Sequence, residues 1–104
     1  MKLVVSAAIS LGLAATTLPA LASLELAQKN ACTACHAVDR KIVGPAYQDV
    51  AKKYGSQMDA VALVAESIRK GGSGKWGPVP MPAQPALDDA ELKALATWVL
   101  GGAK

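Results

Sequence analysis

The chain has 104 residues and a formal net charge of +3, from 11 lysines and arginines against 8 acidic residues. So weak a basic excess does not indicate a nucleic-acid partner, because nucleic-acid-binding domains usually gather their basic residues on one face. With two Trp, two Tyr and no Phe, the chain has little aromatic bulk, so we expect one small domain whose core is completed by a bound group.

Residues 1–22 resemble a secretory signal peptide. Lys2 provides a positive start, residues 3–13 are largely apolar, and Ala20-Leu21-Ala22 has the small residues of a cleavage site. Cleavage after Ala22 would leave residues 23–104 as the mature domain in the periplasm. The alternative is a retained anchor, since about 20 apolar residues can span a bilayer. Polar residues and a proline interrupt this stretch and no basic cluster follows it, so we expect no membrane association after cleavage.

A short helix is predicted to lead into the two cysteines of the chain. Ser23 is a suitable N-cap for a helix over residues 24–30. The run that follows, Cys32-Thr33-Ala34-Cys35-His36, has the C-x-x-C-H pattern of covalent haem c attachment. Thiols at this spacing can form thioethers with the two vinyl groups on one edge of the porphyrin, and the next residue can bind the iron. The run therefore predicts haem c bound through Cys32 and Cys35, with His36 as an axial ligand.

Three other readings of the cysteine pair compete with haem attachment. A thioredoxin-like site would need a βαβ setting, but no strand-like run precedes Cys32. A structural zinc site normally takes four ligands, whereas the chain offers two cysteines and a single histidine. A simple disulfide is permitted in an exported protein but leaves His36 without a role.

Two further helices are predicted after the cysteine run. Gly44-Pro45 should open the first, because proline suits the first turn of a helix, and this helix should run to Tyr54 and end at Gly55. Tyr47, Val50 and Tyr54 would form its apolar stripe. The next helix should span residues 59–70, with basic residues and then glycine at its end.

Met81 is the candidate for the second axial ligand of the iron. No second histidine exists, and of the three methionines, Met1 would leave with the signal and Met58 lies near a predicted turn. Met81 sits in Trp76-Gly77-Pro78-Val79-Pro80-Met81-Pro82, where proline fixes φ and removes backbone donors, so we expect a stiff extended loop. The alternative is that Met81 fills a gap in the core, which is a common use of methionine. His/Met ligation is typical of electron-transfer cytochromes, since it raises the reduction potential.

The last helix has the clearest start. Asp88-Asp89-Ala90-Glu91 predicts a capping box, and the helix should present an apolar face and end at Gly101. Strand-like alternation of useful length is missing from the sequence. The predicted fold class is therefore all-α, with about four short helices around one covalent haem.

The order of these motifs resembles the small bacterial class I cytochromes c, the cytochrome c-551/c-552 group. The resemblance rests on C-T-A-C-H, V-G-P-A-Y, W-G-P-V-P-M-P and a closing A-T-W-V-L, and it covers essentially all of residues 23–104. It implies a compact class I cytochrome c fold with one low-spin haem c.

The resemblance also implies roles for residues around the iron ligands. The carbonyl of Pro45 would accept a hydrogen bond from His36, and the indole of Trp76 would donate to a haem propionate. Gln84 would lie near the sulfur of Met81. Ser67 stands where some relatives have a basic residue near a propionate, which is a departure from the pattern.

The function implied is electron transfer between redox proteins of a respiratory chain, such as a quinol-oxidising complex and a nitrite reductase or terminal oxidase. With both axial positions filled by His36 and Met81, no substrate would bind the metal, so we expect a monomeric carrier rather than an enzyme. The rival interpretations are a haem enzyme such as a peroxidase, and a gas-binding sensor with a labile sixth ligand.

Overall fold

The computed structural model describes residues 20–104, with side chains from Ser23 onward. Its helices, in chain order, are α1 (Ala20–Lys29), the 3-10 turn η1 (Cys32–Ala34), α2 (Tyr47–Tyr54), α3 (Ala60–Lys70) and α4 (Asp89–Leu100). This part of the chain holds two isolated β-bridges and no strand, so the predicted all-α class with four helices is confirmed. No helix in residues 20–104 is long and apolar enough to cross a membrane.

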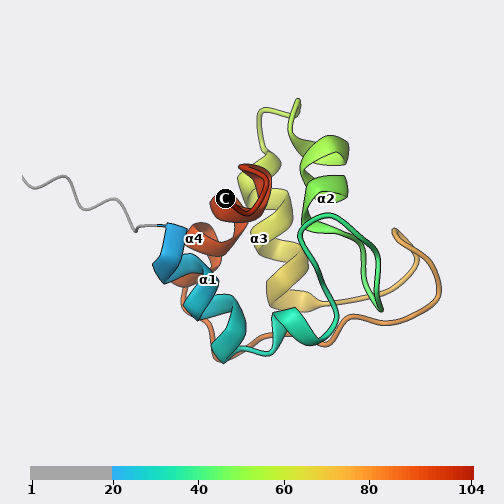
Figure 1. Ribbon diagram of the computed structural model, residues 1–104, viewed down its shortest axis with the longest axis horizontal. Coiled ribbons are helices and arrows are strands. Elements are labelled where there is room, and N and C mark those ends of the chain that lie inside the picture. Colours follow the sequence, from blue (N-terminus) through green and yellow to red (C-terminus); the bar gives the residue numbers. More distant parts are fainter. Residues whose placement is uncertain (1–19) are drawn as a thin grey trace, which may run out of the picture.

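Helix α4 organises the fold because it contacts each of the other three α-helices (Figure 1). The predicted capping box is present: the Asp88 carboxylate accepts from the Glu91 N–H at 2.8 Å, and the Glu91 carboxylate accepts from the Asp88 N–H at 3.1 Å. Five residues of the helix are buried, namely Leu92, Leu95, Ala96, Trp98 and Val99. Their burial against α1, α2 and α3 supplies most of the stabilisation, since helices this short are marginal alone.

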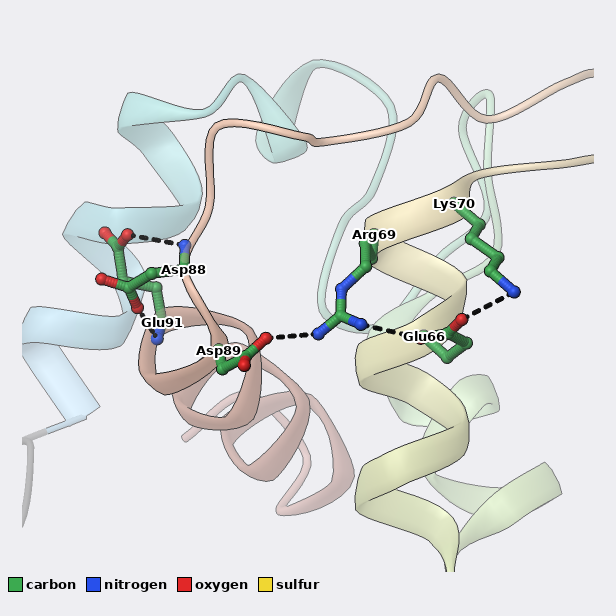
Figure 2. Close-up of polar contacts among 6 residues, drawn as sticks. All are labelled: Glu66, Arg69, Lys70, Asp88, Asp89 and Glu91. Atoms are coloured by element: carbon green, nitrogen blue, oxygen red, sulfur yellow. Dashed lines mark hydrogen bonds and ion pairs between the residues drawn. The ribbon is translucent and has the colours of Figure 1, made fainter.

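Polar contacts join the end of α3 to the start of α4 (Figure 2). The guanidinium of Arg69 contacts Asp89 on α4 and lies 3.3 Å from Glu66 on its own helix. Lys70 lies 2.8 Å from the other Glu66 oxygen and holds the pKa of that carboxyl below its usual range. These groups are exposed, so each pair contributes little to stability. The Arg69–Asp89 contact is the one of these that joins α3 to α4.

Two predicted helix starts are wrong. Helix α1 begins at Ala20, so Ser23 lies inside it and is buried rather than capping it, because the alanines and leucine before Ser23 are themselves strong helix formers. The predicted cleavage point therefore falls within α1, and residues 1–19 of the predicted signal lie outside the described residues. Helix α2 begins at Tyr47 rather than at Gly44-Pro45, because Pro45 belongs to the preceding loop and its carbonyl bonds to a side chain there.

Two long loops lie on the same side of the helices (Figure 1). One covers residues 35–46, after η1, and the other covers residues 71–88, between α3 and α4. Backbone hydrogen bonds hold the first loop closed, from Gly44 to Cys35 at 2.7 Å and from Tyr47 to Ala37 at 2.9 Å. The two loops carry the residues of the candidate site.

Candidate functional site

A cavity of about 210 Å³ lies between the two loops and the inner faces of the helices. All four predicted haem-binding residues, Cys32, Cys35, His36 and Met81, line it. The rest of its wall is mainly apolar and includes Val50, Val64, Ile68, Leu95, Trp98 and Val99. A hydrophobic cavity with a few polar or ligating groups is the usual form of a cofactor site.

The turn η1 places the two cysteines and the histidine on the cavity wall. The carbonyl of Cys32 accepts from the N–H of Cys35 at 3.1 Å and from that of His36 at 2.9 Å, so the backbone turns tightly through the motif. Ala31, just before it, has a left-handed φ of 59°, which turns the chain away from α1. This local geometry brings both sulfur atoms and the imidazole to one side of the cavity.

The structure argues against the other readings of the cysteine pair. Cys32 and Cys35 are not joined by a disulfide. Burial raises the pKa of the Cys32 thiol, whereas a redox-active C-x-x-C site needs a cysteine with a lowered pKa. Within residues 20–104, no group of three or more His, Cys, Asp or Glu is arranged to hold a metal ion.

The imidazole of His36 is held by one hydrogen bond and by packing contacts from two residues. Its Nδ1–H donates to the carbonyl oxygen of Pro45 at 2.7 Å, and since a carbonyl only accepts, the proton is on Nδ1 and Nε2 is left free to bind a metal. The ring of Tyr47 stacks on the imidazole, with centroids 5.5 Å apart. Gly44 lies against the imidazole as well: a Cβ there would be 2.5 Å from Cε1 of His36.

Met81 is half-buried on the opposite loop, and its backbone is paired with Gly72 in an antiparallel bridge. The pairing forms two hydrogen bonds, from Gly72 N–H to Met81 O at 3.0 Å and from Met81 N–H to Gly72 O at 2.8 Å. The predicted extended loop is thus attached to the end of α3. This attachment brings Met81 and His36, which are distant in sequence, to the same cavity.

Trp76, Gln84 and Ser67 differ in how they relate to this cavity. Trp76 lines it and has the Lys53 ammonium 4.5 Å above its ring, a cation–π contact that ties α2 to the loop. Ser67 also lines it, with its hydroxyl donating to the carbonyl of Leu63 at 3.0 Å. Gln84 is not among the lining residues; its backbone N–H bonds to the last turn of α3.

Tyr47 has a larger part in the site than the sequence indicated. Its ring packs between His36 and Trp98, with centroids 5.5 and 5.2 Å away. Its hydroxyl is buried without a partner among the described residues, and burial, with a smaller effect of the nearby Cys32, raises its pKa to about 12. The phenol therefore stays neutral beside the imidazole. The predicted apolar stripe had placed Tyr47 in the core but not against His36.

The residues present fit a covalently bound haem c. The cavity has an apolar lining, two thiols three positions apart, an imidazole with a free Nε2 and a thioether on the opposite loop. Gly44 adds to this fit, because any side chain there would take the space of the imidazole. Cys32 and Cys35 would hold the group, and His36 and Met81, on two different loops that line the cavity, would bind its iron.

Comparison with known proteins agrees with a site for covalent haem c. Residues 24–103 match the cytochrome c family. The chain is 54% identical to cytochrome c-552 of Hydrogenobacter thermophilus over 86% of this chain and 87% of that protein, and 53% identical to cytochrome c-551 of Pseudomonas denitrificans over 73% and 92%. The crystal structure of Nitrosomonas europaea cytochrome c552 superposes with a TM-score of 0.73 at 48% identity, covering 76% of this chain and 98% of that one.

Proposed function

Because this chain belongs to the cytochrome c family, whose members carry one covalent haem c, we propose that it is a monomeric periplasmic electron carrier with His36 and Met81 as iron ligands. When bound, the haem supplies an iron that alternates between the ferrous and ferric states. Transfer of electrons through the haem is common to the family. The proposal adds the ligand pair, the compartment and the place in a respiratory chain.

The observation that carries the proposal is the position of His36 and Met81 in two loops that line one cavity. The Pro45 carbonyl holds the imidazole by Nδ1 at 2.7 Å, which orients Nε2 and increases its basicity as a ligand. The ring of Tyr47 and the backbone of Gly44 restrict rotation of the imidazole. A ligand that is already oriented moves little when the iron changes charge, which favours rapid electron transfer.

The backbone of Met81 is held by its two hydrogen bonds to Gly72, and the flanking prolines restrict its loop. A thioether that stays on the iron in both oxidation states leaves no open position for a substrate. His/Met ligation also raises the reduction potential. Both consequences suit a carrier that exchanges electrons with protein partners, such as a quinol-oxidising complex and a nitrite reductase or terminal oxidase.

Visible spectra of the Met81→Ala variant test the ligand assignment. Loss of the sulfur ligand should abolish the weak absorption at the red end of the ferric spectrum and lower the reduction potential. Met58→Ala is the matched control, because Met58 is fully exposed and does not line the cavity. An unchanged red band in Met81→Ala would refute the assignment.

Two further measurements separate the carrier from the rival functions. A carrier with a closed site should bind carbon monoxide slowly in the ferrous state and should not turn over peroxide. Rapid carbon monoxide binding would favour a gas sensor, and peroxide turnover would favour a peroxidase. For the compartment, N-terminal sequencing of the periplasmic protein should give Ser23 as the first residue; a chain that keeps residues 1–22 would contradict cleavage after Ala22.

A further inference from the structure

The segment that carries Met81 is fastened near the C-terminal end of α3 at two points. Met81 itself forms the reciprocal pair with Gly72, just beyond α3, at 3.0 and 2.8 Å. Downstream, the N–H of Gln84 lies 3.2 Å from the carbonyls of both Ile68 and Arg69 in the last turn of α3. The methionine is therefore placed by a helix end and not only by its own side chain.

Gly71 is the residue that lets this backbone come so close. It ends α3 with a φ of +63°, a conformation that favours glycine. A Cβ at Gly71 would lie 2.3 Å from the Met81 carbonyl oxygen, 2.7 Å from the N of Ala83 and 2.8 Å from the C of Pro82. All three are backbone atoms, so no side-chain rotation would relieve the overlap, and the segment that carries Met81 would have to move away from α3.

We propose that Gly71 is a positioning residue for Met81: it allows the backbone of residues 81–84 to dock on α3, so that the protein presents the thioether to the iron independently of the iron–sulfur bond. This inference rests on the proposed ligation by Met81. Its consequence is that the thioether stays close to the metal when the bond breaks, so it competes strongly with outside ligands.

The test compares Gly71→Ala with Gly102→Ala in the haem-loaded ferric protein. Gly102 also has a positive φ, of +88°, but it does not line the cavity, and a Cβ there would come no closer than 3.9 Å to the Lys104 side chain, an ordinary contact. The two variants therefore share an unfavourable φ, and only Gly71→Ala overlaps the backbone that carries Met81. Imidazole should bind Gly71→Ala at least about tenfold more tightly than wild type, since overlap of this kind in a packed site is commonly worth a factor of that size.

Gly102→Ala should remain within about threefold of wild type, because it lacks that overlap. Equal gains in the two variants, or none in either, would overturn the positioning role. Met81→Ala measured alongside separates the two proposals. If it binds imidazole tightly while Gly71→Ala equals wild type, only the role of Gly71 fails; if Met81→Ala equals wild type, the ligand assignment fails and the inference fails with it.

Amide hydrogen exchange of the wild-type protein gives a second test that needs no variant to fold. Imidazole at saturating concentration displaces the Met81 sulfur from the iron. If α3 holds the backbone, the amides of Gly72 and Met81 should keep their protection to within about threefold, since local opening is governed by these hydrogen bonds. Protection that collapses on imidazole binding would show that the iron–sulfur bond places the segment, and would overturn the inference.

Discussion

The imidazole of His36 is enclosed so closely that one added methyl group should displace it. A Cβ at Gly44 would lie 2.5 Å from Cε1 and 2.9 Å from Nδ1 of His36. The ring cannot simply retreat, since Tyr47 stacks on it and its Nδ1 is bound to Pro45. To restore ordinary contact at 3.4 Å, Cε1 and the Gly44 backbone must separate by about 0.9 Å.

The cost of Gly44→Ala follows from that displacement. Overpacking of this kind destabilises a protein by about 1–3 kcal/mol, and a stretched hydrogen bond to Pro45 adds about 1 kcal/mol. For a domain of this size, each kcal/mol lowers the melting temperature by about 4–8 °C, so a total loss of about 2–4 kcal/mol corresponds to about 8–32 °C. The φ of Gly44 is not in the left-handed region, so backbone strain adds nothing.

Thermal unfolding of the haem-loaded protein, followed by far-ultraviolet circular dichroism, measures this effect. Gly101→Ala is the matched control: it makes the same chemical change at a φ of −79°, and its Cβ would be 3.4 Å from the carbonyl oxygen of Thr97, an ordinary contact. The control should melt within about 3 °C of wild type, since such a surface change is usually worth under about 0.5 kcal/mol. A Gly44→Ala protein as stable as Gly101→Ala would refute the close packing of Gly44 on His36.

Other substitutions test the scaffold around the site. Asp88→Ala should cost about 1 kcal/mol in urea titration, and Asp59→Ala should cost less, because Asp59 makes no side-chain capping bond. Leu92→Ala should destabilise by about 2–5 kcal/mol, because Leu92 is fully buried in the core; a loss under 1 kcal/mol would contradict that burial. Lys70 lowers the pKa of Glu66, so the pair stabilises the fold above the ordinary Glu pKa and loses its effect as pH falls. Glu66→Gln should thus be less stable than wild type near neutral pH but equal to it in acid, and a constant difference across that range would contradict the pair.

Features that depend on neighbouring residues could be predicted from the sequence. The capping box of α4 lies within four consecutive residues, and α2, α3 and α4 end at the glycines that were expected to end them. The all-α fold followed from helical periodicity and the lack of strand-like alternation. The starts of α1 and α2 were mispredicted, because Ser23 and Pro45 have two local uses each and the surrounding structure selects between them.

The C-x-x-C-H run defines haem attachment through local chemistry, since spacing along the chain alone sets which atoms can reach one porphyrin edge. Met81, the candidate for the second iron ligand, also follows from the residue inventory, because the chain has a single histidine. The contacts of Gly44, Tyr47 and Gly71 follow neither from the spacing of the C-x-x-C-H run nor from the residue inventory. Each of them depends on two segments meeting at a distance of a few ångströms, as Gly71 and Met81 do, and no spacing along the chain encodes that approach. One short run of residues thus predicts haem attachment and the first iron ligand. The contacts that orient His36, and the end of α3 that positions Met81, form only once the loops have folded against α3 and α4.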